Sequence, residues 1–175
     1  NLTGRVISAV DLVKGMGLLA GLEAPEIEGA TGYLDTNYAG KVAAALEGLR
    51  EGNFAFVHIE APDEAGHSGV IRDKIRAIED FDRHVVGPMF QTLSGLGPFR
   101  LLILPDHPTP LSLRTHTGNP VPFLAYDSEG AFRAVAGNPF AFSEKGAKNS
   151  PVKIIKGHLL MDRWLNGNLE PGVIQ

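Results

Sequence analysis

Short apolar runs alternate along this chain with a longer helical pattern, and this alternation restricts the fold more than any other feature. Residues 54–61 and 99–104 are nearly all apolar, as in strands that are buried on both faces. Between them, apolar residues recur every three or four positions over 71–89, which predicts an amphipathic helix. Strands that alternate with helices form βαβ units, so the sequence predicts an α/β fold with a mostly parallel sheet flanked by helices.

Local signals predict the remaining elements. Residues 10–22 and 38–50 fit helices, the second capped by Thr36-Asn37, and 121–126 fit a third strand. A last amphipathic helix is predicted from Asn149-Ser150-Pro151 to about residue 165. The apolar residues of the long helix form one stripe at helical spacing, with most charged residues off it: Ile71, Ile75, Ile78, Phe81, Val85 and Met89.

Length, charge and cysteine content exclude several classes of protein. The 175 residues suffice for one domain of ordinary size, and we expect residues 1–175 to form it. The net charge of −4 is not gathered into blocks, which argues against a nucleic-acid partner. No apolar run reaches the roughly 20 residues that span a bilayer, and no signal peptide opens the chain. Cysteine is absent, which excludes disulfide scaffolds, thiolate zinc sites and cysteine nucleophiles but leaves the compartment open. We expect a cytoplasmic location, which a chain without disulfides fits well.

Two polar segments, 62–69 and 105–119, directly follow the predicted buried strands, and we expect both to be loops at the same edge of the sheet. Carboxylate oxygen and imidazole nitrogen suit manganese or zinc, and two metals about 3.5–4 Å apart can clamp a phosphoryl group in transfer. A turn or cap is the alternative role for a single Asp-His pair. The candidate ligands are Asp63, His67, Asp106, His107 and His116.

The motifs around these residues resemble the cofactor-independent phosphoglycerate mutases of the alkaline phosphatase superfamily. The resemblance is closest to the archaeal-type branch, some bacterial members of which carry a homoserine kinase label, and it covers about residues 7–165. It implies an alkaline-phosphatase-like core. The segments that carry it are Asp63-Glu64-Ala65-Gly66-His67, Asp106-His107-Pro108-Thr109-Pro110, His116 with Pro120-Val121-Pro122, Gly29-Ala30-Thr31-Gly32-Tyr33-Leu34-Asp35-Thr36-Asn37-Tyr38, and Ile78-Glu79.

The resemblance implies a role for each candidate ligand. Asp63, His67 and His116 would hold one divalent metal ion, and Asp106 and His107 would hold a second. The metal implied is manganese, with zinc or magnesium as alternatives. In the family, a serine nucleophile takes the phosphoryl group from one hydroxyl of phosphoglycerate and returns it to the other.

Other features of the family have no match here. The nucleophilic serine, an aspartate near the amino terminus and the inserted cap domain all precede the segment that this chain resembles. The chain starts at Asn1 without methionine, and we expect it to be the carboxyl-terminal part of the phosphatase-like core, inactive without its amino-terminal part. Lys14 lies roughly where related mutases contact phosphate, although a solvated lysine fits as well. Ser68 is expected to cap the long helix.

Two alternatives remain open at this point. The same metal cage serves other phosphatases and phosphotransferases of the superfamily, because the cap selects the substrate. A homoserine kinase-like activity belongs to this group, although the sequence contains no P-loop. The second alternative is a metal-binding module without catalytic activity.

Overall fold

Two short parallel strands organise the first part of the chain in the structure, a computed structural model that describes residues 2–132 and 142–174. Strand β1 (Gly4–Ile7) pairs with β2 (Phe54–Val57), in a register that runs from Gly4 opposite Phe54 to Ile7 opposite Val57. The helices between them make the crossover that parallel strands require. This pair confirms the predicted parallel arrangement, although β2 is shorter than the strand predicted over 54–61.

The chain divides into two compact units. The first comprises Asn1–Thr92 with Thr109–Thr117, and the second comprises Leu93–Pro108 with Gly118–Gln175. The polar segment after the third strand therefore contributes to both units. The single domain expected for residues 1–175 stays a prediction, because compact units can belong to one domain.

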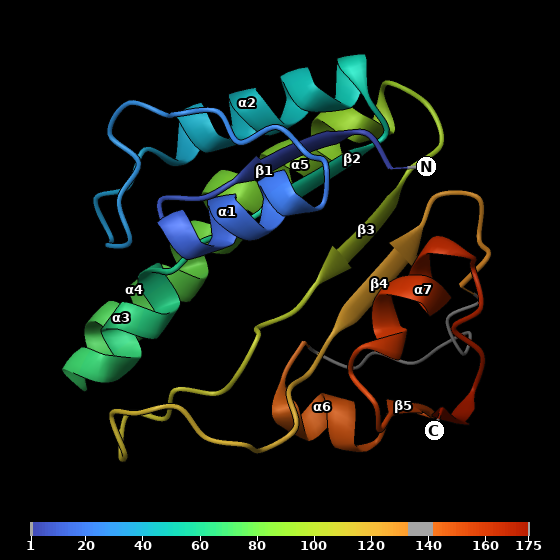
Figure 1. The fold of residues 1–175 in the computed structure, drawn as a ribbon. Coiled ribbons are helices and arrows are strands. Elements are labelled where there is room, and N and C mark those ends of the chain that lie inside the picture. Colours follow the sequence, from blue (N-terminus) through green and yellow to red (C-terminus); the bar gives the residue numbers. More distant parts are fainter. Residues whose placement is uncertain (1, 133–141, 175) are drawn as a thin grey trace. The chain divides into compact units, whose positions relative to one another are not determined.

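Two helices of the first unit lie along the β1–β2 pair (Figure 1). They are α1 (Asp11–Leu19) and α2 (Tyr38–Glu51), both in the regions predicted as helices. The Asn37 side chain accepts a hydrogen bond from the Gly40 amide at 2.9 Å and thereby caps α2. The cap predicted from the Thr36-Asn37 pair is confirmed.

The segment after β2 is a helix, and the loop predicted over 62–69 is wrong. Helix α3 (Ala61–Ser68) begins with Pro62 in its first turn, followed by Asp63 and Glu64. Proline there already has the φ angle of a helix, and carboxylates stabilise a helix N-terminus. The helix ends at Gly69, whose positive φ of 74° terminates it.

The long helix exists as predicted, in three consecutive segments. They are α4 (Ile71–Phe81), the π-helical turn η1 (Asp82–Val86) and α5 (Gly87–Ser94). Ser68 does not cap this helix as expected, because the N-cap position belongs to Val70. The Ser68 hydroxyl instead accepts a hydrogen bond from the Val70 amide at 3.3 Å, in the turn that joins α3 to α4.

The apolar stripe of this helix is buried only in part. Val85 and Met89 belong to the core. Ile71, Ile75 and Ile78 are 64%, 52% and 53% exposed, so the first part of the stripe faces solvent in the structure. Helix α4 packs against α3 through the opposite face, where the buried side chains are small: Ala61, Ala65 and Ala77.

The first strand pair of the second unit is antiparallel. Strand β3 (Arg100–Ile103) pairs with β4 (Leu124–Asp127), in a register from Arg100 opposite Asp127 to Ile103 opposite Leu124. Both strands were predicted, but the parallel pairing was not realised here. The connection between them contains no helix, and a parallel crossover normally needs one.

The rest of the second unit differs from the predicted last helix over 149–165. Residues there form β5 (Val152–Ile154), which pairs in parallel with β6 (Gly172–Ile174), and only α7 (Leu159–Leu165) is helical. The β-branched side chains of Val152 and Ile154 favour a strand, which explains the error. A short helix, α6 (Glu144–Lys148), precedes β5. The described residues thus form the α/β fold that was predicted, with two of the three strand pairs parallel.

Candidate metal centre

Helix α3 places Asp63 and His67 on one face, because residues four positions apart are neighbours on a helix. The Nε2 atom of His67 lies 3.2 Å from Oδ2 of Asp63. The two side chains are 36% and 26% exposed, so a metal ion could reach them from solvent. The helix therefore holds a carboxylate oxygen and an imidazole nitrogen next to each other.

The segment Thr109–Thr117 brings His116 to this pair within the first unit. Its Nε2 atom lies 3.0 Å from Nε2 of His67 and 3.4 Å from Oδ1 of Asp63. Asp63 and His67 are 4 residues apart in the sequence, and His116 follows His67 by 49 residues, yet the three side chains lie together. Their role as metal ligands stays a prediction.

The spacing of the nitrogen and oxygen atoms in this cluster is compatible with a metal ion. With metal–ligand bonds of about 2.1 Å, two ligand atoms lie about 3.0 Å apart at a right angle and about 3.4 Å apart at the tetrahedral angle. The separations in this cluster are 3.0 Å between the two Nε2 atoms, 3.2 Å from His67 Nε2 to Asp63 Oδ2 and 3.4 Å from His116 Nε2 to Asp63 Oδ1, so each imidazole lies near a different oxygen of the same carboxylate. One carboxylate and two imidazoles form a donor set that suits zinc and manganese.

Asp106 and His107, the other two predicted ligands, belong to the second unit. His107 Nε2 lies 3.2 Å from Oδ2 of Asp106, and the His107 amide donates a hydrogen bond to Oδ1 at 3.0 Å. This local pairing holds an aspartate and a histidine side by side. Their assignment to a second metal also stays a prediction.

Lys14 on α1 is engaged with acidic side chains. Its Nζ atom donates hydrogen bonds to both carboxylate oxygens of Glu26, each at 2.9 Å, and lies 3.5 Å from Asp11. The hydrogen bond with Glu26 raises the pKa of Lys14 above its ordinary value, against the opposing effect of burial. A contact with phosphate stays a prediction for this residue.

Sequence reasoning missed two groups that contact the predicted ligands. The Thr109 hydroxyl donates a hydrogen bond to Oδ1 of Asp63, and the main-chain carbonyl of Arg114 lies 3.0 Å from Nδ1 of His67. Thr109 follows the Asp-His-Pro triplet directly, but nothing in the sequence marks its partner. A main-chain carbonyl leaves no sequence signal at all.

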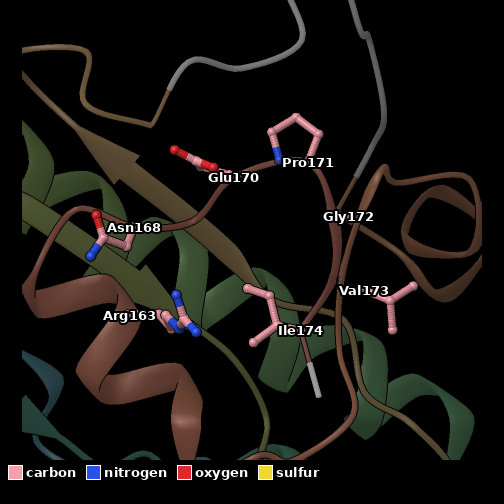
Figure 2. A pocket seen from close by; sticks show the side chains of 7 residues that line it. All are labelled: Arg163, Asn168, Glu170, Pro171, Gly172, Val173 and Ile174. Carbon is pink, nitrogen blue, oxygen red and sulfur yellow. The ribbon is translucent and has the colours of Figure 1, made fainter.

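A hollow of about 260 Å³ lies elsewhere in the second unit, near the end of the chain (Figure 2). Its lining includes Arg163, Asn168 and Glu170 together with an apolar wall from β6. None of the predicted site residues contributes to it. This hollow is therefore separate from the residues that are candidates for metal binding.

An α/β fold with a convergent carboxylate–imidazole cluster is typical of metal-dependent enzymes. The sequence profile of the metalloenzyme superfamily matches residues 1–164. The chain therefore belongs to the metalloenzyme superfamily.

Relatives of this chain carry a more specific name than that of the superfamily. A protein from Methanothrix thermoacetophila is 51% identical over 167 residues, and one from Methanosarcina mazei is 51% identical over 154 residues. Both are named 2,3-bisphosphoglycerate-independent phosphoglycerate mutase. The matches cover 95% and 87% of this chain but only 42% and 38% of the relatives. The chain thus spans about two fifths of their length.

A solved structure supports the fold. The PH0037 protein from Pyrococcus horikoshii matches with a TM-score of 0.81 and 28% sequence identity, over 95% of this chain and 49% of that protein. In the part of the chain that the structure describes, no helix has the length and apolar character needed to cross a membrane.

Proposed function

We propose that this chain is part of a metal-dependent phosphoglycerate mutase, which interconverts 2-phosphoglycerate and 3-phosphoglycerate. The observation that carries the proposal is the convergence of Asp63, His67 and His116 within 3.0–3.4 Å, in a chain about half identical to proteins named as such mutases. The relatives' names favour this reaction over another phosphatase, a homoserine kinase-like transferase or a non-catalytic module. We also propose that the enzyme is cytoplasmic.

Each candidate residue has a role in this proposal. Asp63, His67 and His116 hold one divalent ion and Asp106 and His107 contribute to a second, with manganese as the expected metal and zinc or magnesium as alternatives. Such ions, when bound, neutralise charge on a phosphoryl group and lower the pKa of an attacking hydroxyl.

The remaining machinery lies outside these 175 residues in the proposal. The nucleophilic serine, a further aspartate ligand and the cap domain belong to the amino-terminal part, which is the partner that this chain needs. Lys14 is a candidate phosphate ligand, and it would have to exchange Glu26 for the substrate. The chain by itself is expected to show no mutase turnover.

Metal binding can be tested on the chain directly. We expect the 175-residue protein to bind Mn²⁺ in a calorimetric titration, and Asp63→Asn to weaken binding at least about tenfold because a charged ligand is lost. Glu64→Gln is the matched control, since it removes the neighbouring charge of α3 about 100° around the helix. Equal Mn²⁺ affinities of wild type and Asp63→Asn would show that Asp63 is not a ligand of the metal.

The reaction needs a longer protein that carries this sequence. We expect that protein to convert 3-phosphoglycerate in an enolase-coupled assay with Mn²⁺, and Asp63→Asn to abolish the conversion. A folded and metal-loaded protein without conversion would contradict the mutase assignment while leaving metal binding intact. Robust turnover by the 175-residue chain alone would contradict the placement of the nucleophile outside it.

A further inference from the structure

The segment Thr109–Thr117 supplies more than the ligand His116. Its first residue, Thr109, is 6% exposed, and its hydroxyl donates a hydrogen bond to Oδ1 of Asp63. Five residues later, the carbonyl oxygen of Arg114 lies 3.0 Å from Nδ1 of His67. One segment therefore contacts both candidate ligands that α3 presents.

The contact at His67 determines where that imidazole carries its proton. A carbonyl oxygen can only accept a hydrogen bond, so Nδ1 of His67 must be the protonated nitrogen. In the neutral ring the lone pair is then on Nε2, the atom that lies 3.2 Å from Asp63 Oδ2 and 3.0 Å from His116 Nε2. The ring is held in the tautomer that can bind a metal at the point of convergence.

The contact at Asp63 distinguishes its two oxygens. The Thr109 hydroxyl has a single proton, which it donates to Oδ1. Oδ2 lies on the side of His67 Nε2. The hydroxyl thereby fixes the rotation of the carboxylate, with Oδ1 3.4 Å from His116 Nε2 and Oδ2 3.2 Å from His67 Nε2.

Two backbone features let the segment reach α3. Arg114 has φ of 52°, unusual for a residue with a side chain, and the amides of Leu113 and Arg114 both donate to the Pro110 carbonyl, at 3.0 and 2.8 Å. This tight turn directs the Arg114 carbonyl toward the helix. On α3, Gly66 leaves the space that the Thr109 main chain occupies, since a Cβ there would lie 2.6 Å from the Thr109 carbonyl oxygen.

We propose that Thr109 and the Arg114 turn are positioning elements that set the metal affinity of this site, Thr109 by orienting Asp63 and Arg114 by fixing the tautomer of His67. The inference rests on the proposed metal-binding function. Two residues that are not ligands would thus contribute to the metal affinity. Loss of hydrogen-bond partners of this kind weakens metal binding about tenfold to a hundredfold.

The test of Thr109 compares two variants of the 175-residue chain. Thr109→Val keeps the shape but removes the hydroxyl, and we expect it to weaken Mn²⁺ binding about tenfold. Thr109→Ser keeps the hydroxyl, and we expect its affinity to stay within about threefold of wild type. If the two variants lose affinity equally, or Thr109→Val loses none, Thr109 does not orient Asp63.

The turn is tested through its backbone, because the relevant atom is a carbonyl. Arg114→Gly and Arg114→Val both remove the side chain, but only glycine adopts a positive φ without strain. We expect Arg114→Gly to bind Mn²⁺ like wild type and Arg114→Val to bind it at least about tenfold more weakly. Equal affinity of the two variants would overturn the role of the turn.

A third measurement needs no metal and separates this inference from the proposed function. Long-range nitrogen–proton NMR spectra of the metal-free chain distinguish the two neutral tautomers of histidine. We expect the proton of His67 on Nδ1 in wild type and in Arg114→Gly, and a loss of this preference in Arg114→Val. A proton on Nε2 in wild type would overturn the inference about His67, whereas a wild-type chain with the Nδ1 tautomer but no Mn²⁺ binding would contradict the metal function alone.

Discussion

At the scale of single residues, the second unit contains an ion pair between the buried carboxylate of Asp127 and the partly exposed guanidinium of Arg100. Asp127 is 9% exposed, and its carboxylate accepts hydrogen bonds from the Arg100 guanidinium and from the amides of Glu129 and Ala131, at 2.8 and 3.3 Å for the amides. The hydrogen bond from Arg100 holds the pKa of Asp127 below its ordinary value, against burial, which opposes the shift. Arg100 also donates to the Leu165 carbonyl at 2.6 Å, so the pair joins β3 and β4 to the end of α7.

This pair predicts a pH dependence of stability. A carboxyl with a lowered pKa in the folded state stabilises the fold fully above its unfolded value of about 3.9, and loses this contribution as the pH falls through the folded pKa. Asp127→Asn should therefore cost about 2 kcal/mol near pH 7, because the carboxylate charge that accepts the hydrogen bonds of Arg100 and two amides is lost, and progressively less below pH 4. Urea unfolding followed by the fluorescence of Trp164, the only tryptophan of the chain, measures it.

The control for this prediction is Glu129→Gln, which changes a neighbouring exposed charge in the turn after β4. This substitution should change the free energy of unfolding very little, both near pH 7 and below pH 4. A difference between wild type and Asp127→Asn that stays constant down to pH 2 would contradict the assigned cause.

At the scale of elements, α3 and the segment Thr109–Thr117 form the candidate site together. Gly66 is a point of close approach between them, since an added Cβ would lie 2.6 Å from the Thr109 carbonyl oxygen. That neighbour is a main-chain atom and cannot rotate away. The packing of the segment on α3 therefore requires glycine at this position.

Gly66→Ala should weaken Mn²⁺ binding and lower the unfolding temperature, because the segment has to move away from α3. Gly15→Ala is the matched control in α1, where an added Cβ meets nothing within 4 Å. It should raise stability by up to about 1 kcal/mol through helix propensity alone. Calorimetry and thermal unfolding measure both variants, and a Gly66→Ala protein as stable and as tight-binding as wild type would contradict the close approach.

Helix α4 shows how far local patterns predict an element. The spacing of its isoleucines and the cap of α2 depend on residues a few positions apart, and both elements were predicted correctly. Which part of the stripe is buried depends on the surface that lies opposite the helix, so the spacing alone does not determine it. For α3, the proline and acidic residues of the first turn were visible in the sequence, but the ligand pattern was interpreted as a loop.

At the scale of the whole molecule, the exposed isoleucines of α4 make an apolar surface. Ile71, Ile75 and Ile78 lie at helical spacing on one face and are each more than half exposed. Contiguous apolar surface of this kind promotes association. We therefore expect the purified chain to bind the dye ANS and to self-associate as its concentration rises.

Replacing all three isoleucines by glutamine should reduce dye binding and self-association, while the free energy of unfolding changes by no more than about 1 kcal/mol. Ala77→Gln on the same helix is the contrasting variant, because Ala77 is fully buried and a larger polar side chain there disrupts the packing of α3 on α4. Fluorescence and light scattering measure the association. Unchanged association in the triple variant would locate the apolar surface elsewhere.

The sequence by itself determined the α/β class, the strands β2, β3 and β4, the helices α1, α2 and α4, and the set of Asp and His side chains proposed as ligands, because these depend on periodicity, capping and spacing between near neighbours. Only the tertiary structure decided that His116 joins Asp63 and His67, that Thr109 and the Arg114 carbonyl orient them, and that β3 and β4 run antiparallel. Contacts such as that between His67 and Arg114 join residues 47 positions apart. Their existence depends on the path of the whole chain, which no local pattern encodes.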